Sequence, residues 1–265
     1  MVRANCLKQK KYLICIIITT IQTVRKMRNI PELEKIEKTF GFKYLELFRQ
    51  LCADGMLFAG EYTENWFETE YPKIRKNPPL LLFNCDFEIL YAEDVDAEMK
   101  KMADPNDYRK IPSEIKLVPF GQNGSGDLYC FCLNEKKGKD IPVVLAPHDE
   151  IDATYLAKNL DDFIFISLME AVVNPYIPEE RDEKTEYEDL VAQFNSHKKY
   201  LNKHRQEILE DIYKRKPFTY SCPVNDKETM TCKGLLTQDE YYKLMKAEIK
   251  YNNLYNTFQY MGDEE

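Results

Sequence analysis

Residues 115–133 have the sequence IKLVPFGQNGSGDLYCFCL, in which two apolar runs of strand length flank a short glycine-rich segment. The runs at 115–120 and 128–133 predict two strands, because both are apolar and both are bounded by turn-forming residues. Three glycines are expected to supply the positive φ angles of the turn between them: Gly121, Gly124 and Gly126. The chain therefore reverses here and forms an antiparallel hairpin.

A second polar reversal at 135–140 leads to a third apolar run at 141–146, whose Pro142 suits the start or the edge of a strand. Asn159 then caps a helix, with Asp162 at the third helical position. The apolar stripe of this helix needs a sheet to pack on, and the three-stranded meander supplies one. The sequence predicts an α+β fold: an antiparallel or mixed β-sheet, the meander, packed by helices, with a helical C-terminal extension.

The segments on either side of this core show similar patterns. Apolar residues recur at helical spacing from Leu33 to Leu51, and the runs at 80–83 and 87–91 predict a pair of short strands. Downstream, a charged helix is predicted from Glu180 to Lys216, followed by a last helix that ends near Tyr260. The chain is divided into three parts: a basic and apolar N-terminal segment at 1–26, a folded domain at 27–175 and a helical extension at 176–265.

The net charge of −8 is distributed unevenly along the chain. Residues 1–26 carry +6, residues 27–175 carry −10 and residues 176–265 carry −4. Such an acidic body repels the phosphates of nucleic acids and anionic lipids, and it attracts basic partners. We therefore expect a protein partner with a basic surface and no nucleic acid partner.

The N-terminal segment combines basic residues with an apolar run from Tyr12 to Ile21, as secretory signals do. The run is shorter than the roughly 20 apolar residues that span a bilayer, and no small-residue cleavage site follows it. Either the segment is a weak anchor or signal, or translation starts at Met27. No stable membrane insertion is expected.

Because disulfide frameworks are typical of much shorter chains, the eight cysteines favour a cytoplasmic protein.

Two segments offer candidate contacts with a partner: residues 61–71, and the acidic pair Asp149 and Glu150. Between Glu61 and Tyr71, aromatic side chains alternate with glutamates, a composition typical of binding hot spots with an acidic rim. The alternative interpretation is an ordinary amphipathic helix whose aromatic side chains face the core. The candidate partner-binding residues are Trp66, Glu68, Tyr71, Asp149 and Glu150.

No catalytic, cofactor or metal site is predicted. The glycine-rich turn leads into a strand and carries Asp127 where a bound phosphate would be repelled, which argues against a nucleotide-binding loop. His148 and Asp149 suggest a general base, but sequence neighbours usually point in different directions, so we expect a surface turn. Two further pairs have spacings that do not suit structural zinc: Cys222 with Cys232, and His197 with His204.

Residues 117–129, followed by Pro142-Val143-Val144-Leu145, His148-Asp149 and residues 156–164, together resemble the SUKH superfamily, the Smi/Knr-like proteins. The resemblance implies an α+β domain without catalytic residues to carry over. Bacterial members mostly act as immunity proteins that bind and neutralise toxin domains, often nucleases or deaminases, and fungal relatives regulate cell-wall synthesis. The segment 176–265 lies outside the resemblance.

We therefore expect a non-enzymatic immunity protein that neutralises a cognate toxin of a bacterial polymorphic toxin system, and we expect this toxin to be basic and of the nuclease or deaminase type. The alternative is a regulatory or scaffold adaptor, as in the fungal relatives, with the extension as its docking arm. An enzyme is a third hypothesis, which depends on His148 and Asp149 alone.

Overall fold

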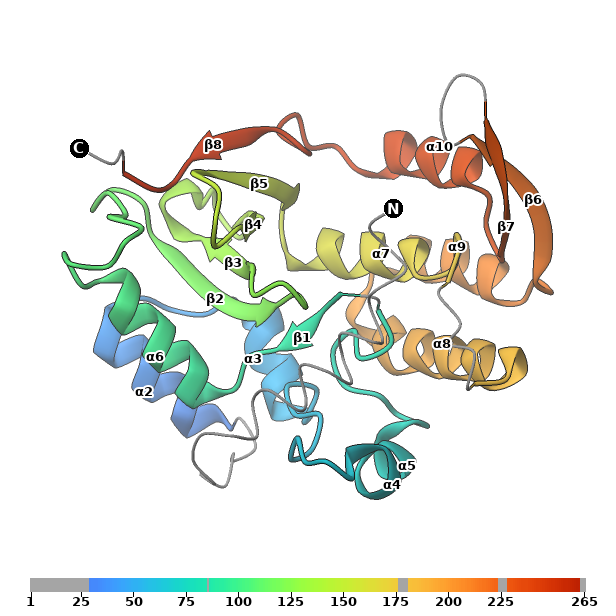
Figure 1. The fold of residues 1–265 in the computed structure, drawn as a ribbon, viewed down its shortest axis with the longest axis horizontal. Coiled ribbons are helices and arrows are strands. Elements are labelled where there is room, and N and C mark those ends of the chain that lie inside the picture. The colour runs from blue at the N-terminus through green and yellow to red at the C-terminus, as the bar shows by residue number, and fades with distance from the viewer. Residues whose placement is uncertain (1–28, 85, 176–180, 224–227, 263–265) are drawn as a thin grey trace.

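We describe the protein from a computed structural model, and the description covers residues 29–84, 86–175, 181–223 and 228–262. A six-stranded antiparallel sheet lies at its centre, in the order β1-β2-β3-β4-β5-β8 (Figure 1). The strands are β1 Glu88–Ile89, β2 Leu117–Gln122, β3 Leu128–Cys132, β4 Val143–Ala146, β5 Asp152–Ala157 and β8 Thr257–Gln259. The predicted α+β class and the three-stranded meander, β2 to β4, are confirmed.

The three glycines of the β2–β3 hairpin have different roles from those predicted. Gly126 has a positive φ of 94°, whereas Gly121 and Gly124 do not. Gly121 lies at a register shift inside β2, where an added Cβ would come within 2.6 Å of the Phe87 ring. The Gly124 N–H donates a hydrogen bond of 2.9 Å to the Asp86 carboxylate. One glycine thus provides the turn conformation and another provides space for a neighbouring side chain.

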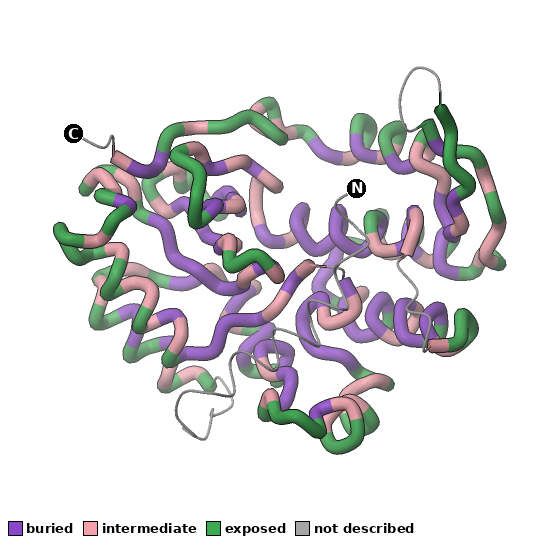
Figure 2. The backbone as a smooth tube through the Cα atoms, viewed as in Figure 1, coloured by how far each residue is buried: buried purple, intermediate pink, exposed green. Residues whose placement is uncertain are grey.

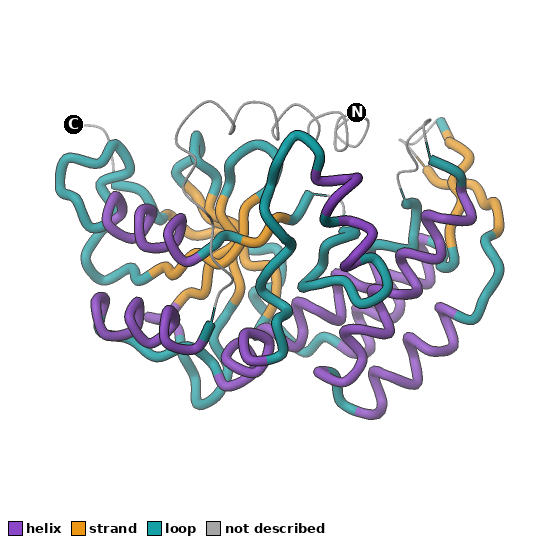
Figure 3. The backbone as a smooth tube through the Cα atoms, turned by 90° about the horizontal axis from the view of Figure 1, so that it is seen from below, coloured by secondary structure: helices purple, strands orange, loops and turns teal. Residues whose placement is uncertain are grey.

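Helices pack around this sheet, and two of their ends lie where the sequence predicts them, at Gly41 and at Asn159. They are α2 Ile30–Phe40, α3 Glu46–Ala53, α4 Trp66–Thr69, α5 Tyr71–Ile74, α6 Ala92–Met102 and α7 Leu160–Glu170. Asn29 and Glu32 form a capping box on α2, and Gly41 ends that helix at a φ of 71°. Asn159 caps α7 by accepting a hydrogen bond from the Asp162 N–H at 2.9 Å. Figure 3 shows the sheet between α2 and α6 on one side and the helices of the C-terminal half on the other.

The C-terminal part contributes strands as well as helices. Its elements are α8 Glu183–His197, the short 3-10 helix η3 Lys198–Tyr200, α9 Lys203–Tyr213, β6 Phe218–Pro223, β7 Thr229–Gly234, α10 Gln238–Glu248 and β8. The predicted single helix from Glu180 to Lys216 is wrong, because Leu201 is extended and Asn202 caps a new helix. The predicted last helix ends at Glu248 instead of near Tyr260, and β8 then pairs with β5.

Residues 80–83 do not form the predicted strand, and of the run at 87–91 only β1 is a strand. Side chains of α8 bond the first segment instead: the Leu81 N–H donates to His197 Nε2 at 3.0 Å, and the Phe83 N–H donates to Gln193 Oε1 at 2.6 Å. Residues 80–83 form turns, and Leu81 has a φ of 51°. The side chains of α8 therefore hold a turn segment where a strand was predicted.

Buried residues of the predicted domain and of the extension form one hydrophobic core (Figure 2). Tyr213 of α9 is an example, since its ring is buried and its hydroxyl donates to the Leu168 carbonyl of α7 at 2.8 Å. Across the described ranges, no helix combines the length and the apolar character that crossing a membrane requires. The predicted signal or anchor at 1–26 lies outside the described residues.

Gly234, at the end of β7, lies against the backbone that follows α7. A Cβ added there would overlap the carbonyl oxygens of Val172 and Val173. We expect Gly234→Ala to lower the free energy of unfolding by about 2 kcal/mol or more, as measured by urea denaturation. Thr231→Ala, at an exposed site on the same strand, is the control and should cost at most about 1 kcal/mol. Equal losses would contradict the close contact.

Candidate partner-binding surface

The β4–β5 connection, residues 147–151, is anchored by the segment that follows β8. The Tyr260 hydroxyl donates to the Pro147 carbonyl. At the other end, the N–H groups of Tyr260 and Met261 both donate to the Ile151 carbonyl, at 2.9 and 3.2 Å. Because both ends are fixed, the side chains between them are presented in one backbone conformation.

The loop that follows α6 supports the same connection from another side. The Tyr108 hydroxyl donates to the His148 carbonyl at 3.0 Å, and the Gly262 N–H donates to the Arg109 carbonyl at 3.0 Å. The Arg109 side chain is buried and bonds the Asp107 carboxylate at 2.7 Å. Burial lowers the pKa of Arg109, but the Asp107 carboxylate outweighs it and holds that pKa above its usual value. The Arg109 guanidinium is therefore bonded within the fold and is not part of the exposed surface.

Asp127, at the end of the glycine-rich hairpin, orients His148. Its Oδ1 accepts hydrogen bonds from the His148 backbone N–H at 3.1 Å and from His148 Nδ1 at 2.8 Å. Asn123 fixes the aspartate in turn, since its amide Nδ2 donates to Asp127 Oδ2 at 2.8 Å. The Asn123 side-chain oxygen also closes the hairpin by accepting from the N–H groups of Ser125 and Asp127. The carboxylate that pairs with His148 is thus Asp127, and His148 itself lies exposed in a bend after β4, as the predicted surface turn requires.

Five residues of these two loops form what we call the loop surface: Tyr108, His148, Asp149, Glu150 and Ile151. All five are exposed, and Tyr108 and Ile151 retain 61% and 53% of their accessible surface. Two large apolar side chains therefore flank the acidic pair Asp149 and Glu150. Exposed apolar residues beside acidic groups are typical of surfaces that bind a basic protein.

Sequence reasoning identified part of this surface. Asp149 and Glu150 are exposed, as a contact requires, whereas Tyr108, Ile151 and Asp127 were not among the predicted contacts. Tyr108 did carry a signal, because a single aromatic residue in the polar, turn-forming sequence ADPNDYRK is expected to lie at the surface. No such signal in the sequence marks Asp127, since its partner His148 is distant along the chain.

The aromatic and acidic segment 61–71 lies on a different side of the molecule, around α4 and α5 (Figure 1). Trp66 is only 6% exposed, and its indole N–H donates to the Ala59 carbonyl at 2.8 Å. The prediction of Trp66 as a partner contact is therefore wrong, and the alternative that its ring faces the core is confirmed. Glu68 is exposed, and its role as a contact stays a prediction.

Tyr71 belongs to a buried ionic cluster, which we call the Asp189 cluster: Tyr71, Arg75, Arg181 and Asp189. The Asp189 side chain is 1% exposed and accepts hydrogen bonds from the other three residues. The guanidinium carbons of Arg75 and Arg181 lie 5.5 and 5.2 Å from the centre of the Tyr71 ring. Burial and the Asp189 carboxylate raise the pKa of the Tyr71 hydroxyl. Tyr71 therefore joins α5 to α8 and is not a free contact residue.

One group of possible metal ligands lies among the described residues. Asp127, His148 and Asp149 bring one ligand atom each within 4.8 Å of one another. Asp127 and His148 already satisfy each other, and two of the three side chains are exposed, so the geometry alone does not define a metal site. Cys222 and Cys232, which the sequence does not pair, form a disulfide between β6 and β7.

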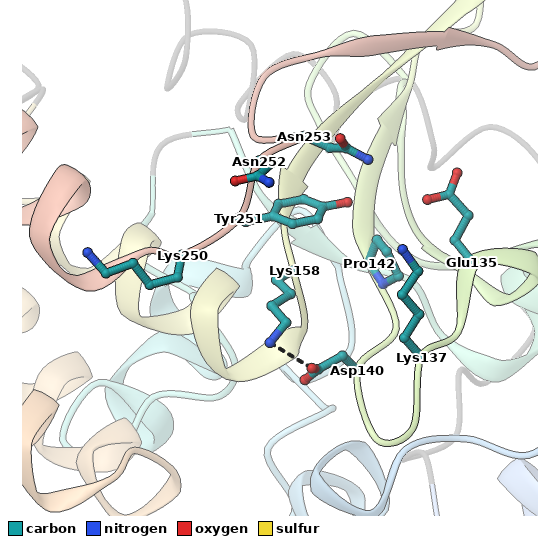
Figure 4. Close-up of a pocket in the computed structure, with 9 residues that line it drawn as sticks. All are labelled: Glu135, Lys137, Asp140, Pro142, Lys158, Lys250, Tyr251, Asn252 and Asn253. Atoms are coloured by element: carbon teal, nitrogen blue, oxygen red, sulfur yellow. Dashed lines mark ion pairs between the residues drawn. The ribbon is translucent and has the colours of Figure 1, made fainter.

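A pocket of about 290 Å³ opens between the β3–β4 connection, the end of β5 and the segment after α10 (Figure 4). It is lined by Glu135, Lys137, Asp140, Pro142, Lys158, Lys250, Tyr251, Asn252 and Asn253. The Lys158 ammonium pairs with Asp140 at 2.8 Å, and Figure 4 shows the Lys250 side chain extending away from the other lining residues. The lining carries both signs of charge, and its chemistry does not select a cofactor.

These features define an α+β domain with one antiparallel sheet, covering helices and an exposed, anchored β4–β5 connection. Residues 31–165 match the SMI1 / KNR4 family (SUKH-1). Since the match covers just over half of the chain, the protein belongs to this family. The matched region ends within α7, so α8 to β8 lie beyond it. No curated protein and no solved structure matches the chain.

Proposed function

We propose that the protein is an immunity protein, which binds a basic toxin domain of the nuclease or deaminase type through the loop surface and thereby neutralises it. Membership of the SMI1 / KNR4 family supports this role, as does the net charge of −8. The observation that carries the proposal is that the exposed Asp149 and Glu150 lie in the chain between His148, whose carbonyl accepts from the exposed Tyr108 at 3.0 Å, and the exposed Ile151.

Each part of the loop surface has a distinct contribution to binding. The acidic pair attracts a basic partner, and such steering raises association rates by about 10- to 1,000-fold. Tyr108 and Ile151 provide apolar contacts that exclude water from the centre of an interface. Because the hydrogen bonds to Tyr260 and Tyr108 hold the connection in place, little conformational entropy is lost on binding. An interface of about 1,600 Å² blocks a toxin without any catalytic group.

The test of the proposed function is co-expression with each toxin encoded beside the gene. We expect growth to be restored in cells that make one of these toxins, and we expect the two proteins to purify as a complex. Neither protection nor a complex with any adjacent toxin would contradict the proposal. The adjacent genes also discriminate against the adaptor alternative, because immunity genes lie next to toxin genes.

We expect the double variant Asp149→Asn and Glu150→Gln to slow association with the toxin about tenfold at low salt. The fold should be unaffected, since both side chains are exposed. Stopped-flow fluorescence at low and physiological salt measures the rate. The matched control is Glu61→Gln with Glu64→Gln, two exposed acids near α4. A loss confined to the control pair would place the interface on the α4 side instead.

The adaptor alternative requires the extension to act as a docking arm. In this fold β8 pairs with β5, and Asp189 of α8 bonds Arg75 of the domain at 2.8 Å. An extension built into the sheet and the core is poorly suited to move as a separate arm. These contacts favour the immunity role over an adaptor of that form.

A further inference from the structure

The pocket of Figure 4, which we call the Tyr251 pocket, lies at the opposite end of β4 and β5 from the loop surface. Two of its walls, the β3–β4 connection and the end of β5, belong to the region that matches the family, whereas residues 250–253 lie beyond that match. The C-terminal part of the chain therefore completes this cavity. Its volume of about 290 Å³ is near the lower end of the roughly 300–1,000 Å³ of ligand pockets, so it suits a small ligand.

The β3–β4 connection has a closed backbone conformation at the pocket. The Lys137 N–H donates to the Asp140 carbonyl at 2.9 Å, and the Asp140 N–H donates to the Lys137 carbonyl at 3.1 Å. Gly138, between them, has a positive φ of 63°. The Asp140 carboxylate is already neutralised, since it pairs with Lys158 at 2.8 Å and accepts from the Asn159 amide at 2.6 Å. Asp140 and Lys158 therefore satisfy each other.

Two other charged groups that line the pocket have no counter-charge. Among the described residues, neither the Glu135 carboxylate nor the Lys137 ammonium takes part in an ion pair. Glu135 accepts a hydrogen bond from the Tyr155 hydroxyl. Burial and this carboxylate raise the pKa of Tyr155, so the hydroxyl stays neutral and leaves the charge of Glu135 uncompensated. The pocket thus presents one negative and one positive group to a ligand.

Tyr251 supplies an aromatic wall and a buried hydroxyl. Its ring packs edge-on against the Tyr155 ring, with 6.0 Å between the ring centres. The Tyr251 hydroxyl is shielded from solvent and forms no hydrogen bond of normal geometry to the described residues, although the Asn253 side chain is nearby. Figure 4 shows it pointing toward the side of the pocket that Lys137 and Glu135 line. A buried polar group of this kind indicates a water molecule or a ligand group beside it.

We propose that the Tyr251 pocket binds a free α-amino acid with an apolar side chain. The carboxylate of the amino acid pairs with the Lys137 ammonium, and its ammonium group pairs with the Glu135 carboxylate. Its side chain packs on the Tyr251 ring. Two opposite charges on one small molecule match the two uncompensated groups, whereas a simple anion or cation matches only one of them.

The test uses the isotope-labelled full chain and L-phenylalanine, followed by heteronuclear NMR. We expect a Kd of about 1 mM, as is usual for a ligand of about a dozen heavy atoms. The shifted signals should be those of the pocket, at residues 135–142, 158 and 250–253. Phenylpropionate lacks the ammonium group and phenylethylamine lacks the carboxylate, so each should bind at least about tenfold more weakly.

Substitutions of the two charged groups separate recognition from folding. Glu135→Gln should weaken phenylalanine about tenfold and leave phenylpropionate unchanged, whereas Lys137→Gln should weaken phenylalanine about tenfold and leave phenylethylamine unchanged. A damaged fold would instead weaken all three compounds, and Lys137 is exposed, so its substitution should leave the fold intact. The matched control is Lys136→Gln, an exposed lysine on the same connection that does not line the pocket, and it should change none of them.

Three results would overturn the proposal. The first is the absence of shifts at the pocket residues with L-phenylalanine at about 10 mM, roughly ten times the expected Kd. The second is equal binding of the three compounds, and the third is equal weakening of phenylalanine by Lys136→Gln and Lys137→Gln. None of these results bears on the toxin, which the loop surface is proposed to bind.

Discussion

Asp189→Ala is expected to lower the free energy of unfolding by about 3 kcal/mol. The Asp189 carboxylate is almost fully buried and accepts hydrogen bonds from Tyr71, Arg75 and Arg181. Its removal leaves two guanidinium groups beside one tyrosine ring, with only Glu186 at 3.0 Å from Arg181 and Glu188 at 3.8 Å from Arg75 as counter-charges. The two arginines remain partly exposed, at 30% and 21% of their side-chain surface, which keeps the cost toward the lower end of the range for buried ion pairs.

Urea denaturation followed by tryptophan fluorescence measures this change, because the single tryptophan, Trp66, lies in the neighbouring helix α4. The matched control is Asp211→Ala, which removes an exposed aspartate of α9 paired with Arg215, two residues beyond the end of that helix. Such surface pairs contribute less than about 1 kcal/mol. If the two variants unfolded at the same urea concentration, the Asp189 cluster would not hold α5 against α8.

Acid is expected to destabilise the protein through His197. This side chain is fully buried, and its Nε2 accepts from the Leu81 N–H, so Nδ1 carries the proton and donates to the Gln193 carbonyl at 2.7 Å. Burial lowers the pKa of His197 to about 4, against about 6.5 in an unfolded chain. Between these pH values the unfolded state binds more protons, so stability is complete above about pH 6.5 and falls by roughly 3 kcal/mol as the pH drops to about 4.

The measurement is the free energy of unfolding at about pH 7 and about pH 4.5 for the wild type and for His197→Gln. Glutamine retains a donor and an acceptor but does not titrate, so the wild type should lose about 2 kcal/mol more than the variant over this interval. His204→Gln, at an exposed site, should follow the wild type. Equal losses in the wild type and His197→Gln would show that His197 is not held neutral.

The elements that the sequence predicted well depend on local signals. The apolar runs of β2, β3 and β4, the capping residue Asn159 and the helix-ending Gly41 each act on their own neighbours. These interactions are short in range, so their effect can be inferred from composition and spacing. The family resemblance in the same region is confirmed by the match over residues 31–165.

The elements that the sequence did not predict depend on distant partners. Residues 80–83 resemble a strand in sequence, but two of their N–H groups bond His197 and Gln193, on a helix far along the chain. Strand β8 is only a few residues long and is defined by its pairing with β5. The helix predicted from Glu180 to Lys216 is interrupted at Asn202, which caps α9. The prediction followed the regular spacing of apolar residues and missed this capping residue. In the candidate site, Asp127 and Tyr108 acquire their roles only when the loops meet.

The central claim is that the loop surface is where the partner binds, and hydrogen–deuterium exchange of the chain with and without its toxin tests it most directly. We predict slower exchange in the complex at residues 104–110 and 147–151, which carry the loop surface, with exchange around α4 and α5 unchanged. Protection confined to residues 61–75 or to the C-terminal helices, with the two loops unaffected, would contradict the claim.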